Sequence, residues 1–342
     1  MHKTINNRFQ FSLISMNDLD VEEYNSIASK RIFTTFPWIS FVQNDSKAEP
    51  VFVRITTDDT FVGYFTGAIV KKFGIRILGS PFNGWSTCHM GIDSDTDLSK
   101  CDIIRELIPF LFKELKCRFI EIIDRDITVE DAKASGFYAE EATTLTMPID
   151  MDDDALFARM KPVCRTNIRQ FERRGARLEI AEPNDSFAEQ YYSQLEDVFA
   201  KQGMVPTYSL EKVKCLLRSL AGTGSLLCLR VISPDDRCIA TSIYLGYNRV
   251  FYFWGGASYR SDQNYRPNEY MFWSAIRYWR ERGFSTFDMC GVRDYKRKLG
   301  STEDTYAQLS FSRPKLLIFL KNAAKSAYFL SLKIKGKLFH KK

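Results

Sequence analysis

The last third of the chain holds several residue types suited to binding and transferring a chemical group. Gly255 and Gly256 follow an aromatic run, which suits a strand that splays or lets a ligand approach its backbone. Arg260 and Arg266 lie in the next polar segment, and a guanidinium can bind a phosphate through two parallel hydrogen bonds. Asp288 ends an alternating run, where it either acts as a base if it is buried or caps the following loop. These residue types suit a ligand-binding site.

The elements that must position these residues follow the order strand, loop, helix, strand and loop. The aromatic run 251–254 predicts the first strand, and the alternating run 284–289 predicts the second. Pro267 presets the start of the helix and Asn268 can cap it. Apolar residues then recur at helical spacing until a glycine ends the helix; they are Phe272, Ala275, Ile276 and Trp279, followed by Gly283.

The motifs of this stretch, taken in order, resemble the second half of proteins in the GNAT-like superfamily. The resemblance is to the branch shared by the FemABX peptidyltransferases and the BioF2-like, or acetyltransferase 6, proteins of polysaccharide and cell-envelope gene clusters. It covers nearly the whole chain. The motifs are Arg266-Pro267-Asn268 at the helix start, Phe287-Asp288 with Gly291 after it, Tyr295-Lys296 followed by Leu299-Gly300, and Asn167-Ile168-Arg169 further upstream.

The resemblance implies an α+β fold of mixed α/β character, built of two tandem GNAT-like units. Each unit is expected to be a central mixed, mostly antiparallel sheet flanked by helices. Two helices, a three-strand meander, a helix and further strands follow residue 150 in the predicted order, and the first half gives a shorter version. We therefore expect a GNAT-like domain over 1–150, a second over 151–312 and a basic amphipathic tail over 313–342. The acidic run 152–154 marks the boundary as the start of a helix.

The resemblance also implies roles for single residues. Lys296 matches a lysine beside the acyl-transfer centre of Fem-like proteins, where an ammonium stabilises an oxyanion or holds a phosphate; otherwise Lys296 is a surface lysine. Asp288 is the second expected catalytic residue, orienting Lys296 or acting as a base. The expected donor-binding residues are Gly255, Gly256, Ala257, Arg260, Arg266, Asn268 and Tyr295. The expected acceptor-binding residues are Arg165, Asn167, Arg169, Tyr252 and Trp254, and core packing explains the last two equally well.

The turn over 258–268 departs from the usual GNAT pattern because it contains no glycine. A glycine-rich turn at a helix N-terminus ordinarily binds the donor's phosphates, so we expect Arg260 and Arg266 to replace it. Fem-like relatives, whose donor is an aminoacyl-tRNA, share this departure. The expected co-substrate is therefore an acyl-CoA, such as acetyl-CoA, or an aminoacyl-tRNA. No metal is expected, because two of the three histidines lie near the chain ends.

Basic residues are concentrated in two segments. The helix expected over 161–175 carries Lys161, Arg165, Arg169 and Arg173 four residues apart, a stripe that is either a solvated face or a binding surface for an anion. The tail over 313–342 holds nine lysines and arginines and no acid. It is either an amphipathic helix at an anionic membrane surface, a contact for tRNA, or a basic surface helix.

Composition is compatible with a cytoplasmic protein of two domains. The chain has 342 residues, of which 45% are hydrophobic, and no apolar run reaches the length of about 18 residues needed for a membrane span. The N-terminus lacks the apolar core of a signal peptide, and the eight cysteines show no CxxC pairing, which favours a reducing compartment. The basic tail favours peripheral association with the inner face of the membrane.

The expected function is that of an acyltransferase, most readily an N-acyltransferase, acting on a cell-envelope or polysaccharide precursor. The acceptor group is an amine or a hydroxyl. Two alternatives stay open. One is a peptidyltransferase of the Fem type that uses aminoacyl-tRNA; the other is a non-catalytic GNAT-like module that binds an anionic glycan or lipid precursor.

Overall fold

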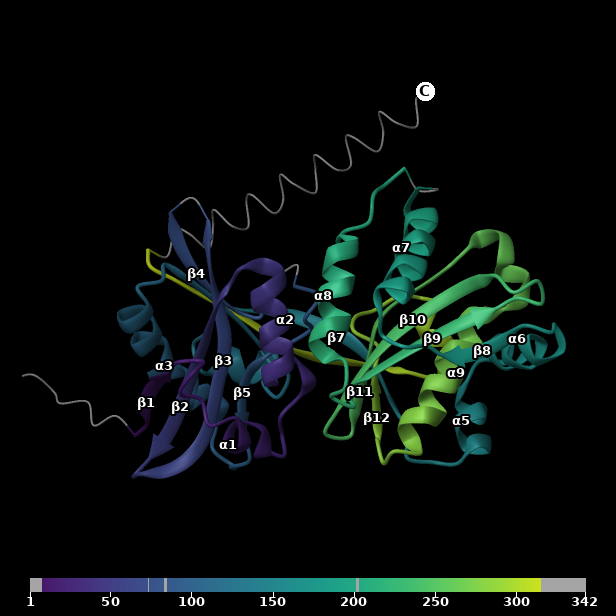
Figure 1. Cartoon of the computed structure of the whole chain (residues 1–342). Helices are drawn as coiled ribbons and strands as arrows, with labels where there is room; N and C mark the ends of the chain where they lie inside the picture. The colour runs from purple at the N-terminus through teal and green to yellow at the C-terminus, as the bar shows by residue number, and fades with distance from the viewer. Residues whose placement is uncertain (1–7, 73, 83–84, 201–202, 315–342) are drawn as a thin grey trace, which may run out of the picture. The chain divides into compact units, whose positions relative to one another are not determined.

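The computed structural model describes residues 8–72, 74–82, 85–200 and 203–314 (Figure 1). The chain divides into two compact units that interleave in sequence. Unit 1 takes its described residues from 1–27, 47–142 and from Tyr306 onward, and unit 2 consists of Ala28–Ser46 and Thr143–Thr305. The contiguous halves expected from the sequence differ from these units at three places, because 28–46 and 143–150 belong to unit 2 and 306–312 belongs to unit 1. The predicted tail, 313–342, lies outside the described residues from 315 onward.

Unit 1 contains a sheet in which the strand order is β1-β2-β3-β4-β6-β13, with β5 paired to β3. β4 and β6 run parallel, and the other pairs are antiparallel. The strands are β1 (Gln10–Ile14), β2 (Glu49–Thr57), β3 (Thr60–Lys72), β4 (Ile75–Ser80), β5 (Gly91–Ser94), β6 (Phe119–Asp124) and β13 (Thr302–Ser312). The helices are α1 (Val21–Ser26), α3 (Lys100–Leu115) and α4 (Val129–Ala134).

Helix α3 forms the main contact with the core of unit 1. Its apolar residues recur at helical spacing, and Ile103, Leu107 and Leu111 are completely buried among the apolar side chains of the sheet. Burial of each such side chain stabilises the fold by about 1.5–3 kcal/mol. Ser99 caps the helix by accepting a hydrogen bond from the Asp102 amide.

In unit 2 the strands pair in the order β7-β12-β11-β10-β9-β8. β11 and β12 run parallel, and the other pairs are antiparallel. The strands are β7 (Ala139–Pro148), β8 (Arg177–Ile180), β9 (Leu226–Ile232), β10 (Cys238–Tyr247), β11 (Val250–Ser258) and β12 (Thr286–Asp288). The α-helices are α2 (Phe36–Ser46), α5 (Asp153–Arg159), α6 (Pro162–Arg173), α7 (Asp185–Ala200), α8 (Leu210–Leu220) and α9 (Pro267–Arg280). Three short 3₁₀ helices are η1 (Ile32–Thr34), η2 (Arg260–Tyr265) and η3 (Lys296–Leu299).

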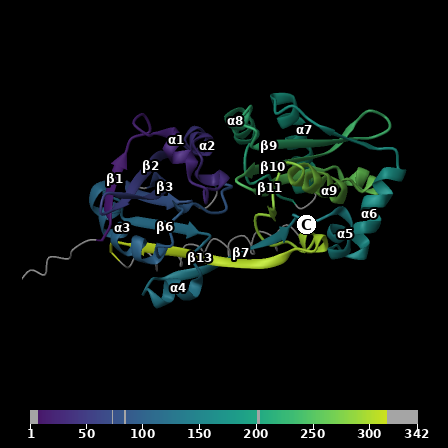
Figure 2. The ribbon, with the colours of Figure 1, turned by 90° about the horizontal axis from the view of Figure 1, so that it is seen from below.

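Helices cover both faces of the meander β9–β10–β11. In Figure 2, α7 and α8 lie on one side of these strands and α9 lies on the other. The two faces carry alternate residues of the strands, so each face has its own apolar set. Tyr244 and Phe253 contact Phe272 of α9, whereas Trp254 contacts Tyr191 of α7.

Helix α2 belongs to unit 2 because its partners are there. It lies beside α8 in Figures 1 and 2, and the Lys212 ammonium lies 3.0 Å from the Asp45 carboxylate. Trp38 is completely buried and packs edge-on against Phe33 and Phe41. Trp38 is therefore a core residue, and both of its aromatic partners belong to unit 2.

Candidate functional site

Strands β11 and β12 diverge after three paired residues. The parallel register joins Val250 to Thr286 and ends with Tyr252 opposite Asp288. β12 stops there, whereas β11 continues to Ser258. The edge of β11 beyond Tyr252 is thus released from β12, which leaves backbone donors and acceptors accessible to a ligand.

A β-bulge lies at the start of this released edge. Tyr244 pairs with Phe253 and Ile243 pairs with Gly255, so Trp254 is an extra residue on β11. A bulged residue leaves the regular ladder, and bulges are common next to active sites because they redirect side chains. Here the bulge brings Phe253 and Gly256 to the same face of the sheet, opposite Tyr244 and Ser242.

A pocket of about 630 Å³ opens on this face, entirely within unit 2. Its wall is built from β10, β11, η2, the first turns of α9, η3, and single residues of α6 and α7. Seven of the residues predicted from the sequence line it together; they are Asn167, Gly256, Ala257, Arg260, Arg266, Asn268 and Tyr295. The predicted donor-binding residues are therefore gathered at one place, with the exception of Gly255.

The pocket has a cationic mouth at the N-terminus of α9. Arg260, Arg266 and Lys298 contribute positive charge, and Glu269 is the one carboxylate among the lining residues. Glu269 accepts a hydrogen bond from Asn167 at 2.9 Å and lies 3.7 Å from the Lys298 ammonium. Within the described ranges neither Arg260 nor Arg266 forms an ion pair, so both guanidinium groups remain available to an anion.

Arg266 occupies the N-cap position of α9 in the left-handed conformation, with φ of 59°. Its Nε donates to Gln170 Oε1 at 3.3 Å, and no side chain caps the helix. The first amides of a helix lack internal partners and, together with the helix dipole, favour an anion. The predicted cap was wrong: Asn268 lies inside the first turn and donates to Gln263 Oε1 instead.

Lys296 is buried, so the alternative of a surface lysine is wrong. Its ammonium donates to the carbonyl oxygens of Met289, Cys290 and Gly291 at 2.5, 3.3 and 3.4 Å. The same nitrogen lies 5.3 Å from the centre of the Phe253 ring, which lines the pocket. Lys296 itself is not among the lining residues, so its visible contacts fix the loop after β12.

Asp288 is also buried and acts on the same loop. One carboxylate oxygen accepts hydrogen bonds from the Thr144 hydroxyl at 2.6 Å and from the Cys290 amide at 2.8 Å. The Gly291 amide donates to that same threonine hydroxyl at 3.0 Å. The predicted loop-capping role of Asp288 is therefore present in the structure, and Lys296 and Asp288 together hold residues 289–291.

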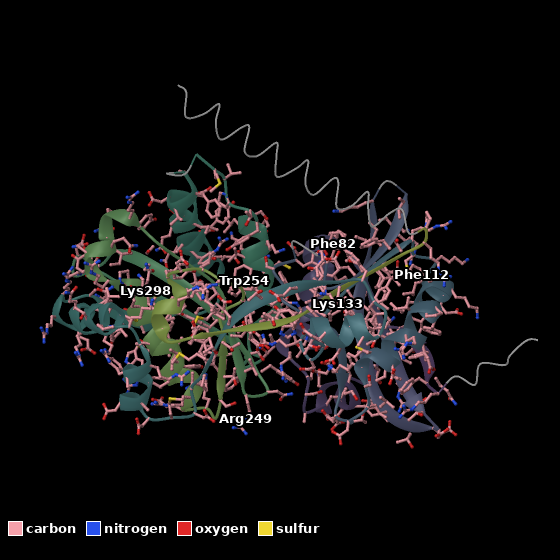
Figure 3. All side chains as sticks on the ribbon, turned by 180° about the vertical axis from the view of Figure 1, so that it is seen from behind. Phe82, Phe112, Lys133, Arg249, Trp254 and Lys298 are labelled. Carbon is pink, nitrogen blue, oxygen red and sulfur yellow. The ribbon has the colours of Figure 1, made fainter. Side chains whose placement is uncertain are left out.

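The structure places the remaining predicted residues away from the pocket wall. Tyr252 is buried, and its ring centre lies 4.7 Å from that of Phe33. This contact is core packing, which the sequence analysis gave as the alternative to acceptor binding. Trp254 lies on the opposite face against Tyr208, and Figure 3 shows it well apart from Lys298.

Three further predicted residues have local structural contacts. A Cβ at Gly255 would lie 2.3 Å from the Tyr191 hydroxyl, so the glycine permits helix α7 to pack closely. Arg165 donates to the Phe157 carbonyl oxygen at 3.4 Å, and the Arg169 guanidinium lies 5.9 Å from the Phe157 ring. Neither arginine lines the pocket, although their helix contributes Asn167 to it.

Several lining residues were missed by the reasoning from sequence. The most informative are Ser242 and Tyr244 of β10, Gln263 of η2, Glu269 of α9 and Lys298 of η3. Two signals were available: Ser242 and Tyr244 alternate along a predicted strand, and Lys298 lies two residues after Lys296. The bulge that turns Phe253 and Gly256 toward this face has no local signal, because it depends on the register between two strands.

The described residues contain no group of histidine, cysteine and acidic side chains that is arranged to hold a metal ion. In the same ranges, every helix is too short or too polar to traverse a lipid bilayer.

Residues 158–297 match the family model described as an acetyltransferase (GNAT) domain. No curated protein matches the sequence of this chain. The resemblance to the GNAT-like superfamily is therefore confirmed, and the matched segment contains nearly all of the pocket wall.

Solved structures show that the similarity in fold extends over most of the chain. FemX is similar with a TM-score of 0.70 and 13% identity, over 86% of this chain and 96% of FemX. A tandem GNAT protein from the clavulanic acid biosynthesis pathway gives a TM-score of 0.56 and 11% identity, over 89% of this chain and 98% of that protein. The C-terminal domain of a protein from Agrobacterium fabrum, described as a lysylphosphatidylglycerol synthetase, gives a TM-score of 0.58 and 10% identity, over 89% of this chain and 95% of that domain. The predicted mixed α/β fold of tandem GNAT-like units is confirmed.

Proposed function

We propose that this protein is an acyltransferase that uses an acyl-CoA, such as acetyl-CoA, to modify an amine or hydroxyl of a cell-envelope or polysaccharide precursor. One observation carries the proposal: the released, bulged edge of β11 lies beside a cationic pocket at the N-terminus of α9. GNAT domains are acyltransferase domains, and the matched family model covers this part of the chain. The class of acceptor comes from the family resemblance.

The residues of the mouth suit the phosphates of such a donor. Arg260 and Arg266 would bind them, assisted by the free amides of α9, and would replace the glycine-rich turn that this chain lacks. The released edge of β11 at Gly256 and Ala257 would hold the acyl-bearing arm. Backbone amides that face a developing oxyanion stabilise it, and the bulge supplies backbone groups outside the regular ladder.

Lys296 and Asp288 then act as positioning residues in this proposal. Both hold the loop 289–291, and η3 directly after it supplies Lys298 and Leu299 to the pocket. An amine or hydroxyl acceptor must lose a proton during acyl transfer. A direct catalytic role for Lys296 or Asp288 in that step stays a prediction from the family resemblance.

The test of the proposal is the affinity for CoA and acetyl-CoA, measured by calorimetry, of the wild type and two arginine variants. Arg266→Gln should weaken binding about 10–100-fold, because a charge-assisted hydrogen bond contributes about 1.5–3 kcal/mol. Arg173→Gln, an exposed arginine of α6 outside the pocket wall, is the matched control and should bind as the wild type does. Wild-type affinity in Arg266→Gln, or the absence of CoA binding in all three proteins, would refute the assignment.

A second candidate donor is an aminoacyl-tRNA, favoured by the exposed cations of α6. Arg169, Arg173 and Arg174 are exposed on the helix that contributes Asn167 to the pocket. Binding of a polyanion along this helix should weaken steeply as salt rises, since counterions are released. Arg173→Gln then distinguishes the two donors, because it should reduce affinity for tRNA and leave affinity for CoA unchanged.

Two further expectations remain predictions. A non-catalytic module that binds an anionic glycan or lipid precursor would bind without turnover, which separates it from the enzyme. Association of the tail 313–342 with an anionic membrane, and a cytoplasmic location, rest on the sequence, since the described residues end at 314.

A further inference from the structure

The turn that carries the two arginines of the pocket mouth keeps its shape without glycine. It covers residues 258–268, from the end of β11 through η2 to the start of α9. Five of its residues line the pocket, namely Ser258, Arg260, Gln263, Arg266 and Asn268. Where side chains rather than a glycine-rich backbone bind a ligand, the backbone beneath them must be fixed by other contacts.

Hydrogen bonds join the two ends of this turn to each other and to helix α7. The Gln263 side-chain amide donates to the Ser258 hydroxyl at 2.5 Å and its oxygen accepts from Asn268 at 3.3 Å. The Arg260 amide donates to the Asp197 carboxylate of α7 at 3.4 Å. These contacts bridge the turn, but they do not connect its middle to the sheet.

Asp262 connects the middle of the turn to the loop between β9 and β10. It is buried, and its Oδ1 accepts a hydrogen bond from Nη2 of Arg237 at 3.0 Å. Its Oδ2 accepts from the Ser261 hydroxyl at 2.7 Å. Arg237 is exposed, and its Nε donates to the Asp235 carboxylate at 2.6 Å. The ion pair therefore ties η2 to a loop that precedes it by 25 residues.

The place of this carboxylate requires an explanation other than contact with a ligand. Asp262 is the only acid among residues 258–268, and neither it nor Arg237 lines the pocket. A negative charge close to Arg260 and Arg266 opposes the binding of an anion. A buried ion pair is also no more stabilising than well-packed neutral residues would be. What Asp262 supplies is a directed link that fixes η2, on which both arginines depend.

We propose that Asp262, held by Arg237, is a positioning residue that sets the affinity of the pocket for the donor's phosphates. The inference rests on the proposed function, in which Arg260 and Arg266 bind those phosphates. Asp262 acts through the backbone of η2 and does not touch the ligand.

The test is the affinity for CoA of Asp262→Ala, measured by calorimetry. Removing a negative charge beside the mouth would by itself strengthen anion binding, whereas displacing the arginines weakens it. We expect affinity to fall about tenfold, since a small misplacement of binding groups is costly. Asp262→Asn should lose less, because its amide oxygen can still accept from Arg237. The melting temperatures without ligand should stay close to that of the wild type, since Arg237 is exposed and keeps Asp235 as a partner.

Asp235→Asn is the matched control, because it alters the other partner of the same arginine and makes no contact with η2 among the described residues. It should bind CoA as the wild type does. Equal or tighter CoA binding by Asp262→Ala, or an equal loss in Asp235→Asn, would overturn the inference. If Asp262→Ala does not fold, Asp262→Asn decides, and affinity at or above the wild-type value overturns the inference.

The wild type and Arg266→Gln separate this inference from the proposed function. If the wild type does not bind CoA, the proposed function fails and the positioning role fails with it. If Arg266→Gln loses affinity and Asp262→Ala keeps it, the proposed function stands and the positioning role is wrong.

Discussion

The two units share an order of elements but differ in what occupies the ends of their strands. In unit 1, β2, β3 and β4 form a meander that is followed by α3 and the parallel strand β6. In unit 2, β9, β10 and β11 form a meander that is followed by α9 and the parallel strand β12. Unit 2 has a pocket where its two parallel strands diverge. In unit 1, the chain itself supplies the partners at the corresponding place.

The polar groups at the strand ends of unit 1 are paired internally. The Ser80 hydroxyl donates to the Thr66 carbonyl oxygen at 2.5 Å and accepts from the Gly91 amide at 2.9 Å. The Asp124 carboxylate accepts from the Ile92 amide at 2.9 Å and pairs with the Lys100 ammonium at 3.2 Å. Burial opposes the charge on Lys100, but the nearby carboxylates raise its pKa to about 12. The difference teaches that the same strand order can be used for a binding site or for a closed structural core.

Among the variants that test this comparison, Lys100→Met in unit 1 should have the largest effect. Removing the cation leaves Asp124 buried and unpaired, which should reduce the free energy of unfolding by about 3–5 kcal/mol at neutral pH. Without its cation, the Asp124 carboxyl should have a folded-state pKa above its unfolded value. The loss should therefore be smaller at pH 5 than at pH 8, because protonation favours the folded state of such a group.

Chemical denaturation at the two pH values measures this effect. Arg105→Met is the control, since Arg105 pairs with Asp102 at an exposed position and should cost about 0–1 kcal/mol. A Lys100→Met protein as stable as the control would show that unit 1 does not depend on this ion pair.

Lys296→Met tests whether unit 2 uses its buried lysine for structure or for chemistry. The variant leaves three loop carbonyl groups without their donor, so the free energy of unfolding should fall by about 1–3 kcal/mol. Single-turnover acyl transfer should fall with it, by up to about 10²-fold, through displacement of the loop.

The control for this change is Arg297→Met, whose side chain pairs with Glu303 near the surface and should matter little. An unchanged melting curve combined with a loss of turnover of about 10²–10³-fold would contradict the positioning role. That result would favour direct oxyanion stabilisation by Lys296 instead.

The smallest expected effect is that of Gly256→Ala on the released edge of β11. The new Cβ would lie 3.1 Å from the Phe253 ring and 3.3 Å from the Ser242 Cβ, so the change in stability should stay within about 1 kcal/mol. Affinity for CoA should fall severalfold, because the methyl group projects into the pocket where the donor approaches the backbone. Calorimetry and a melting curve measure both effects. Unchanged affinity would place the donor elsewhere.

The sequence by itself determined most of the elements and their order. The alternating run 284–289 contains β12, and the helix predicted after Pro267 is α9. The acidic run 152–154 supplies the cap of α5, where Asp152 accepts a hydrogen bond from the Ala155 amide. These predictions succeed because helix spacing, strand alternation and capping depend on neighbours within a few residues. The motifs around Arg266 and Asn268 also located the pocket mouth.

Only the tertiary structure decided which unit each segment joins and which side chains meet. Helix α2 is near the N-terminus in sequence, but its charged and aromatic partners place it in unit 2. Gly256 lines the pocket and Gly255 does not, because of one bulge in the pairing of β10 with β11. Lys296 lies in a basic run, but its ammonium donates hydrogen bonds to carbonyl groups six and seven residues earlier in the chain, which keep it buried. Each outcome depends on register and long-range packing, which local residue patterns do not specify.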